Sequence, residues 1–485
     1  MGAKMKVAGW ICLGAVAGAM TTLQLSAVAK PGNSVPLPLE EFQQLAAVFG
    51  LLKAEYVEPV DEKKLINDAI AGMVSGLDPH SAFFDKKHLK EFVESTTGRF
   101  VGVGIEIGME DGLVRVVSPI EGSPAFRAGL RTNDLITRID DVAVRGMTID
   151  QAVKRMRGEP ATKVQLTIFR KSESRNFPVT IVREEIKVQS VRSKVVEPGY
   201  AWLRVSQFQE RTVDDFARKV GEIYQQEPNL KGLVLDLRND PGGMLEAAIA
   251  LSAAFLPADV EVVSTRGQLS SSQFSFRATP AHYLRRGQTD PLRKLPAALK
   301  SVPLIVLVNE GSASASEIVA GALQDHKRAS VMGAQSFGKG SVQNIRCLAG
   351  QYPLEQCPTA AVKLTTSRFY TPNGNAIQTR GILPDVQLDE TEEGNVIGAL
   401  RTREADLEKH LSGAEDGDPK LREAREAERK RLEENLRARG KDLKPLPDFG
   451  SAEDWPLRQA LNRLQGKPVV AAQAPVVRKA EAKAD

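Results

Sequence analysis

The chain has 485 residues, of which 65 are Lys or Arg and 61 are Asp or Glu, and its formal net charge is +4. This length predicts three or more structural units, and the charged and apolar fractions are those of an ordinary globular protein. Because acidic and basic residues are mixed along the chain and the net charge is small, composition gives no case for a nucleic-acid-binding protein.

The N-terminus has the pattern of an export signal. Lys4 and Lys6 precede an uncharged run over residues 7–20, and an A-x-A site ends at Ala29. This order predicts a secretory signal peptide over residues 1–29 that is cleaved after Ala29. An uncleaved inner-membrane anchor is the alternative, although polar residues between positions 21 and 26 make a poor membrane span. Either way, we expect an exported protein that faces the periplasm.

Export bears on the cysteines. Cys12 lies inside the signal segment, so Cys347 and Cys357 remain, and they flank a short loop. In an oxidising compartment such a pair is a disulfide candidate. Two unpaired thiols are the alternative.

Composition and periodicity divide the rest of the chain into segments. The first carries apolar residues at helical spacing, and the second changes to short strands between glycine turns. More than half of the residues from 401 to 440 are charged, so most of that stretch must face water. We predict an N-terminal helical region over 30–95, a β-rich domain over 96–185, an α/β core over 186–395, a charged helical region over 396–470 and a disordered tail over 471–485.

Two apolar runs in the core segment predict a parallel sheet. Residues 231–238 and 302–308 have the composition of strands that are buried on both faces. Each run leads through a glycine-bearing turn into a helix, over residues 244–255 and 314–326. Strand, turn and helix in repeated order indicate βαβ crossover units in a mixed sheet.

A lysine between two glycines, Lys339, follows this pattern. Gly333, four further residues and Gly338-Lys339 approximate a phosphate-binding P-loop, but Gly340 stands where that motif needs Ser or Thr to hold Mg²⁺. The residues after it have the pattern of a strand and not of a helix. Nucleotide binding is therefore not favoured, and the lysine is either a solvated loop residue or a group with another role.

Small residues open the helix after the second apolar run, with serines at positions 312, 314 and 316. The first N–H groups of a helix are unpaired and carry a positive dipole end, so they can stabilise a developing oxyanion beside a serine nucleophile. Helix capping explains any one of these serines equally well, because Ser is a favoured N-cap residue.

A serine nucleophile needs a base, and the histidines offer no obvious one. None of the five lies in a glycine-rich strand-end setting, and all fit surface or helix-capping positions better: His80, His88, His282, His326 and His410. A Ser-Lys pair is the known alternative to a Ser-His pair.

Six motifs, in this order, resemble those of the carboxyl-terminal processing peptidases, also called tail-specific proteases, and the resemblance extends from about Leu39 to Leu388. They are Leu77-Asp78-Pro79-His80-Ser81, the core of a PDZ domain over 96–185, Asp236-Leu237-Arg238-Asn239 with Pro241-Gly242-Gly243, Gly311-Ser312-Ala313-Ser314-Ala315-Ser316-Glu317-Ile318, Phe337-Gly338-Lys339-Gly340-Ser341-Val342-Gln343, and Thr371-Pro372-Asn373-Gly374. The resemblance implies an α/β protease core with a mixed sheet, βαβ units and a crotonase-like fold, joined to the PDZ domain and to helical N- and C-terminal segments.

The resemblance also assigns roles. It implies that Ser314 is the nucleophile, Lys339 the general base and Gln343 the residue that orients the lysine. The N–H groups of Ala315 and Gly242 would form the oxyanion hole. Asp325, eleven residues after the nucleophile on the same helix, is read as structural. On a regular strand Lys339 and Gln343 would stand about 13 Å apart, so the two side chains must lean together or the strand must bend.

The PDZ resemblance places a carboxylate-binding loop at Phe100, Val101, Gly102 and Val103, whose backbone N–H groups would bind a C-terminal carboxylate while the peptide adds as a strand. A purely structural β-domain is the alternative. Arg157 could couple this domain to the protease, although an exposed helix-end arginine is the simpler interpretation.

These features predict an exported serine endopeptidase that recognises protein C-terminal tails through its PDZ domain and cleaves upstream with a Ser-Lys dyad. No cofactor, metal or nucleic acid is implied. The expected partners are protein substrates, a second copy of the chain bound through the terminal helices, and an activating adaptor. The competing hypotheses are a catalytically silent PDZ scaffold or chaperone, and a Ser-His hydrolase, for which the chain lacks a G-x-S-x-G elbow.

Overall fold

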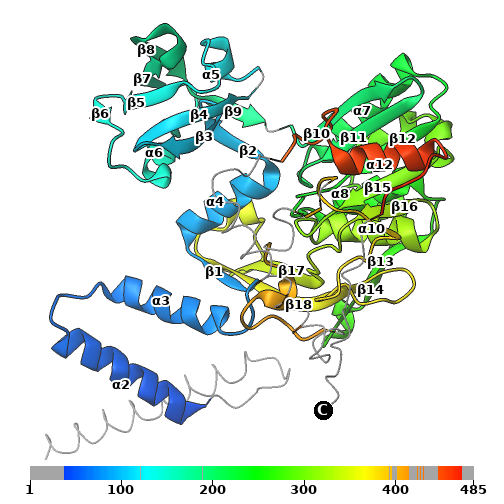
Figure 1. Cartoon of the computed structure of the whole chain (residues 1–485). Helices are drawn as coiled ribbons and strands as arrows, with labels where there is room; N and C mark the ends of the chain where they lie inside the picture. The colour runs from blue at the N-terminus through cyan, green and yellow to red at the C-terminus, as the bar shows by residue number, and fades with distance from the viewer. Residues whose placement is uncertain are drawn as a thin grey trace, which may run out of the picture. The chain divides into compact units, whose positions relative to one another are not determined.

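The computed structural model describes residues 38–120, 122–187, 189–392, 394–395, 401–413 and 446–471 and the isolated positions 423, 427 and 430 (Figure 1). The predicted signal segment, residues 396–400 and nearly all of residues 414–445 of the predicted charged region, and the predicted tail after residue 471 lie outside these residues. Within the described part of the chain, no helix combines the length and the apolar character that a bilayer crossing requires. The chain divides into two compact units between Ala69 and Ile70.

The N-terminal segment forms two helices, α2 (Leu39–Glu55) and α3 (Glu62–Ser75). Helix α2 buries none of its side chains, and Leu39, Phe42, Leu45 and Val48 of its apolar pattern are exposed. A short strand, β1 (Ala82–Phe84), then precedes α4 (Lys86–Thr97), so the region expected to be helical also contributes a strand. Three residues leave no local periodicity, and β1 exists because it pairs with a strand that lies far away in the sequence.

The second segment folds as a five-stranded antiparallel path in the order β3-β4-β5-β7-β8, with β6 paired to β5. Its apolar core contains Val114, Val116, Ile136 and Leu166, each fully buried. A separate two-stranded ladder joins β2 to β9. The elements are β2 (Arg99–Gly102), β3 (Ile105–Glu110), β4 (Leu113–Pro119), α5 (Pro124–Arg127), β5 (Leu135–Ile139), β6 (Val142–Ala143), α6 (Ile149–Met156), β7 (Lys163–Arg170), η1 (Lys171–Glu173), β8 (Arg175–Val182) and β9 (Glu184–Lys187).

The α/β core contains a six-stranded sheet in the order β10-β11-β12-β15-β16-β19. Strand β10 is antiparallel to β11, and every further pair is parallel. Strands β12 and β15 are buried along their whole length, as their apolar sequences predict. The elements are β10 (Val191–Glu197), β11 (Tyr200–Val205), α7 (Thr212–Gln226), β12 (Gly232–Asp236), α8 (Leu245–Phe255), β15 (Leu304–Val308), α10 (Ala315–Asp325), β16 (Ser330–Gly333) and β19 (Val386–Gln387).

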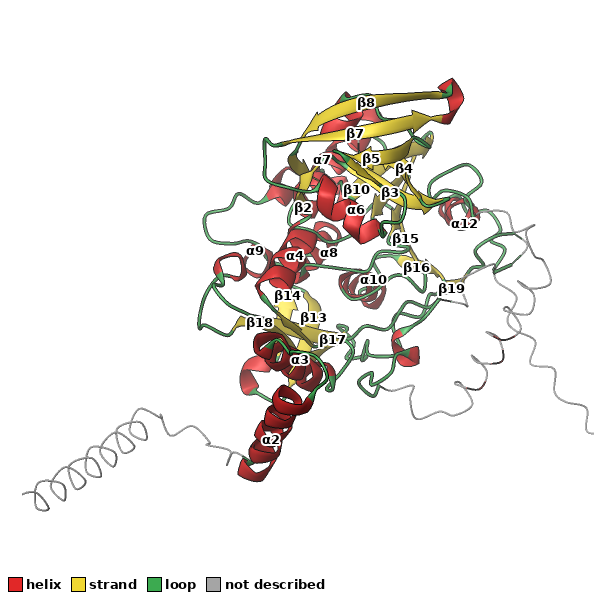
Figure 2. Cartoon of the chain, turned by 90° about the vertical axis from the view of Figure 1, so that its left-hand side faces the viewer, coloured by secondary structure: helices red, strands yellow, loops and turns green. Residues whose placement is uncertain are grey.

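A second sheet in the core runs in the order β1-β18-β13-β14, with β17 also paired to β18. Helix α10 lies between this sheet and the parallel strands β15 and β16 (Figures 1 and 2). Its small residues allow close packing, and residues 315 to 323 are all buried. The remaining elements are β13 (Glu261–Gly267), η2 (Ser270–Ser272), β14 (Phe274–Arg277), α9 (Pro280–Tyr283), η3 (Pro291–Lys294), η4 (Ala297–Lys300), β17 (Ser341–Cys347), η5 (Leu354–Gln356) and β18 (Ala361–Tyr370).

The C-terminal residues return to the core. The segment over 401–413 contains the short helix η7 (Glu404–Asp406), and α12 (Trp455–Leu464) packs on the face of the parallel sheet opposite α8 and α10. Leu457, Ala460 and Leu461 of α12 contact Val234 and Ile305 within one apolar cluster. The highly charged stretch over 401–440, which is expected to face water, lies largely outside the described residues, whereas α12, near the end of the predicted charged helical region, is a core helix.

Candidate active site

Ser314 stands at the turn between β15 and α10. Its backbone has φ 54° and ψ −111°, a left-handed conformation that a residue with a side chain rarely adopts. Such strain persists only where the surroundings impose it, and it concentrates at functional sites. The backbone N–H of Ser314 donates to Oε2 of Glu317 at 2.7 Å, which holds the turn in place.

The three serines of this turn differ in what their hydroxyl groups do. Ser312 donates to the carbonyl oxygen of Leu237 at 2.8 Å, and Ser316 donates to that of Asp240 at 3.0 Å. Both side chains are fully buried. Among the described residues, the Ser314 hydroxyl donates to no protein acceptor, so its proton is the one available to a base.

Glu317 joins the two segments that carry Ser314 and Lys339. Besides the N–H of Ser314, its carboxylate accepts the backbone N–H groups of Lys339 at 2.9 Å and Gly338 at 2.6 Å, and the hydroxyl of Ser336 at 2.6 Å. Burial raises the pKa of Glu317 to about 7, although these donors favour the charged form. Sequence reasoning gave Glu317 no role, but the spacing Ser314-x-x-Glu317 is a capping-box signature that identifies it.

Lys339 and Gln343 are in contact. Nζ of Lys339 donates to Oε1 of Gln343 at 3.1 Å. The expected separation of about 13 Å applies to a regular strand, whereas Lys339 lies in the loop before β17 and a register shift falls between Val342 and Gln343. Burial lowers the pKa of Lys339, the charge of Lys363 lowers it further, and nearby carboxylates oppose both effects: Glu404, Glu317 and Asp78.

The flanking glycine explains how the lysine loop reaches this position. Gly338 has φ 94°, and a Cβ atom there would lie 2.6 Å from the carbonyl oxygen of Thr379. The loop therefore approaches neighbouring backbone more closely than a side chain permits.

Gly242 lies close to both Ser314 and Ala315. A Cβ atom on Gly242 would stand 2.8 Å from the nitrogen of Ala315 and 2.9 Å from Cβ of Ser314. Within the described residues, the N–H of Ala315 has no acceptor. The N–H of Gly242 instead donates to Oδ1 of Asp240 at 2.8 Å, so in this arrangement it is already occupied. Burial raises the pKa of Asp240 to about 8. The oxyanion-hole assignment of these two N–H groups stays a prediction.

A buried ion-pair chain supports the strand end that leads to this loop. Arg238 donates to both carboxylate oxygens of Asp236, at 2.9 and 2.6 Å, and to both of Asp454, at 2.9 and 2.7 Å. Its guanidinium carbon lies 4.3 Å from the ring centroid of Phe449. Asp454 caps α12 by accepting the N–H of Leu457. No sequence pattern linked Asp454 to Arg238, because the contact joins residues that are far apart in the chain.

A carboxylate-binding loop was predicted at Phe100, Val101, Gly102 and Val103, but the first three of these residues lie in β2 itself, which pairs with β9, and only Val103 follows the end of the strand. Strand β3, which comes next, is an edge strand of its sheet among the described residues. Arg157 donates to Glu94 at 2.9 Å, and its guanidinium carbon lies 5.2 Å from the ring centroid of Phe100. In the structure, Arg157 therefore contacts α4 and β2, the helix and strand that precede the five-stranded β-domain.

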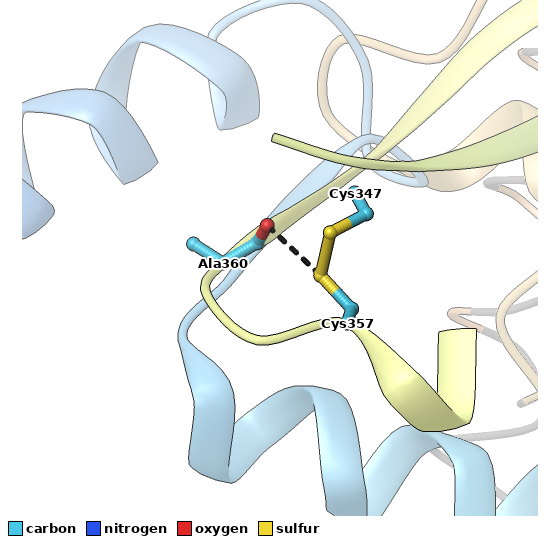
Figure 3. Close-up of a disulfide and its surroundings, with 3 residues drawn as sticks. All are labelled: Cys347, Cys357 and Ala360. Carbon is cyan, nitrogen blue, oxygen red and sulfur yellow. Dashed lines mark hydrogen bonds between the residues drawn. A yellow bond between two sulfur atoms is a disulfide. The ribbon is translucent and has the colours of Figure 1, made fainter. Parts of the chain in front are cut away.

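The two cysteines form a disulfide, Cys347–Cys357, with Cα atoms 5.7 Å apart (Figure 3). Sγ of Cys357 lies 3.5 Å from the carbonyl oxygen of Ala360 (Figure 3). The bond closes the loop between β17, which carries Gln343, and β18. It packs against Leu89 of α4.

The other candidate residues lie elsewhere. Asp325 accepts the N–H of Asn373, which agrees with a structural role. Each histidine ring forms a hydrogen bond with a group outside the serine turn. The pairs are His80 with Glu404, His88 with Asp85, His282 with the Arg277 backbone, His326 with the Glu261 carbonyl, and His410 with the Leu407 carbonyl. The described residues contain no group of His, Cys, Asp and Glu that could hold a metal ion.

Comparison with known proteins identifies the family. Residues 199–388 match peptidase family S41, residues 115–170 match the PDZ domain, and residues 10–88 match the N-terminal domain of the activating protease CtpB. The carboxy-terminal-processing protease of Bartonella bacilliformis is 41% identical over 383 residues, which cover 78% of this chain and 82% of that protein. The carboxy-terminal processing protease CtpB of Bacillus subtilis is 34% identical over 349 residues, covering 71% and 67%.

A solved structure is also similar. The photosystem II D1 C-terminal processing protease is 28% identical with a TM-score of 0.41, over 72% of this chain and 86% of that one. The sequence relatives and the three matched domains carry the assignment. This chain belongs to the carboxy-terminal processing proteases, the serine-type peptidases of family S41 that carry a PDZ domain.

Proposed function

We propose that this protease cleaves exported proteins after recognising their C-terminal tails, with Ser314 as nucleophile and Lys339 as general base. The observation that carries the proposal is the Glu317 carboxylate, which binds the backbone N–H groups of both Ser314 and Lys339. It supports a fixed relation between the two segments, while the Ser314 hydroxyl keeps its proton free. Periplasmic export is supported by the predicted signal segment and by the disulfide.

The chemistry follows from this arrangement. Neutral Lys339 takes the Ser314 proton as Oγ attacks the substrate carbonyl carbon, and the resulting oxyanion accepts the free N–H of Ala315. Lys339 then gives that proton to the leaving amine, and the peptide bond breaks to leave an acyl group on Ser314. Water hydrolyses the ester with Lys339 again as base, which restores the serine.

Burial makes a lysine base feasible. A free lysine titrates near pH 10.4, so holding it neutral at pH 7 costs about 4.6 kcal/mol. General base catalysis contributes about 10²–10⁴-fold, and an unperturbed lysine would lose most of that gain. The lowered pKa of Lys339 reduces this cost.

Activity is expected to rise from acid to mildly alkaline pH, because only neutral Lys339 can accept the Ser314 proton. Lys363→Met removes a positive charge that lowers the pKa of Lys339, so the rise should move to higher pH. The measurement is kcat/KM against pH for both proteins. If activity rises near pH 7 and the midpoint is the same in the Lys363→Met protein, the titrating group is Glu317 and not Lys339. Full activity at pH 5 would contradict a lysine base.

Tail recognition is supported by the PDZ domain. Strand β3 is an edge strand in the described structure, so a peptide can add beside it with its carboxylate near Val103, between the end of β2 and the start of β3. Because this domain lies between the N-terminal helices and the core in the sequence, tail binding there can favour the active arrangement of the protease.

The test compares one denatured substrate with an apolar C-terminus against the same chain ending in several charged residues. We expect the apolar tail to be cleaved faster by the full-length protein, because the strand-and-pocket mode favours apolar side chains. Ser314→Ala protein serves as the control for contaminating proteases. Equal cleavage rates for the two tails would show that the PDZ domain does not select substrates by their C-terminal residues.

A further inference from the structure

The amide of Gln343 is held on both sides. Its Oε1 accepts Nζ of Lys339, while its Nε2 donates to Oγ of Ser341 at 2.9 Å and to Oγ1 of Thr365 at 3.2 Å. Gln343 and Thr365 are directly opposed in the β17–β18 ladder, which explains why their side chains meet.

Thr365 in turn contacts a buried carboxylate. Its hydroxyl donates to Oδ1 of Asp78 at 3.1 Å. The same carboxylate accepts the N–H groups of His80 and Ser81, at 2.8 and 2.9 Å, and the Ser81 hydroxyl at 2.6 Å. Asp78 is 3% exposed, and although burial raises its pKa, these hydrogen bonds bring the pKa below its ordinary value. Asp78 is therefore ionised at neutral pH and acts only as an acceptor.

The charge of Asp78 decides the direction of the whole chain of hydrogen bonds. A carboxylate can only accept hydrogen bonds, so the Thr365 hydroxyl donates its hydrogen bond to Asp78. With its proton committed, Oγ1 of Thr365 can only accept, and it therefore binds the NH₂ side of the Gln343 amide. The carbonyl side of Gln343 is then left for Lys339. A Thr365 hydroxyl free to rotate could instead donate to the Gln343 carbonyl oxygen and compete with the lysine.

We propose that Asp78 and Thr365 are positioning residues that orient the Gln343 amide and, through it, the amine of Lys339. The inference rests on the proposed role of Lys339 as base. A fixed N–H···O bond to Gln343 leaves the lone pair of the neutral amine directed away from that amide, where it is available to the Ser314 proton. Asp78 lies outside residues 199–388, the part that matches the peptidase family, so the N-terminal segment completes the site.

The pairing of β1 with β18 explains how this distant residue arrives. Ala82 is opposite Lys363 and Phe84 is opposite Ala361, so the turn over residues 78–81 meets β18 beside Thr365. The N–H of Thr365 also donates to Oγ of Ser81 at 3.1 Å, which closes the turn onto the strand.

Two substitutions of Thr365 separate the positioning role of its hydroxyl from the packing of its side chain. Thr365→Val keeps the branched side chain and removes the hydroxyl, and we expect kcat to fall about tenfold with KM unchanged. Thr365→Ser keeps the hydroxyl and should stay within about threefold of wild type. Both are compared by steady-state cleavage of the same denatured substrate, and thermal unfolding checks that each variant is folded.

A double-mutant cycle provides the second readout. If Thr365 acts through Gln343, Thr365→Val should cause no further loss of kcat in a Gln343→Ala background, whereas a purely structural effect would add to it. Wild-type kcat for Thr365→Val, equal impairment of Thr365→Ser, or additivity with Gln343→Ala would each overturn the inference.

Ser314→Ala and Lys339→Ala, measured in the same series, distinguish the proposed dyad from the proposed positioning role of Asp78 and Thr365. If both are inactive, a failure of Thr365→Val to behave as expected contradicts only the positioning role. If either one cleaves at the wild-type rate, the proposed dyad is wrong and the positioning role fails with it.

Discussion

Ser314→Ala should reduce cleavage to the background rate, and Lys339→Ala should lower kcat about 10²–10⁴-fold. The first variant removes the oxygen that forms the acyl-enzyme, and the second removes the group that takes its proton. Because nucleophile and base act as a unit, the double variant should lose little more than the more impaired single variant. The measurement is the rate of cleavage of a denatured protein substrate at mildly alkaline pH.

The neighbouring serines provide matched controls within the same turn. Ser312→Ala and Ser316→Ala each remove a buried hydroxyl that donates to a backbone carbonyl, and each should cost about 1 kcal/mol of stability while leaving the chemistry possible. Loss of cleavage in either control together with activity in Ser314→Ala would show that the nucleophile is a different serine.

Local patterns were sufficient to predict much of this site from the sequence. The apolar run of β15, the small residues that open α10 and the glycines around Lys339 each carry a physical signal at short range. The order of the motifs then resembles that of a family, and this resemblance implies the pairing of Ser314 with Lys339. The helices predicted over residues 244–255 and 314–326 are α8 (Leu245–Phe255) and α10 (Ala315–Asp325) in the structure.

Long-range contacts explain what the sequence left out. Strand β1 has only three residues and exists through its pairing with β18, and Asp78 meets Thr365 only because of that pairing. The contact of Asp454 with Arg238 likewise joins distant parts of the chain. Neither periodicity nor capping signals can report such a contact, since both describe neighbours along one element.

The buried arginine at the strand end before the Gly242 loop should be a sensitive position for stability. Arg238 is 4% exposed and bonds to Asp236 and Asp454, which are 0% and 3% exposed. Burial alone would raise the pKa of Asp236, but the attraction of Arg238 holds it below its ordinary value. Removing the arginine therefore leaves Asp454 buried without its cation and Asp236 with Arg204 alone, whose Nη1 lies 3.4 Å from Oδ1 of Asp236. Breaking a buried ion pair in this way costs about 3–5 kcal/mol.

Arg238→Met is expected to lower the free energy of unfolding by about 3–5 kcal/mol in urea titration. The loss of unfolding free energy should be smaller at pH 5 than at pH 8. Without Arg238, burial raises the folded-state pKa of Asp236 above the unfolded value, and such a carboxyl destabilises the fold more as the pH rises and it ionises. Adding Asp236→Asn and Asp454→Asn should recover part of the loss by removing the uncompensated charges. Arg458→Met, on the exposed face of α12, is the matched control and should stay within about 0.5 kcal/mol of wild type. An Arg238→Met protein as stable as that control would mean that the C-terminal helix does not depend on this ion-pair chain.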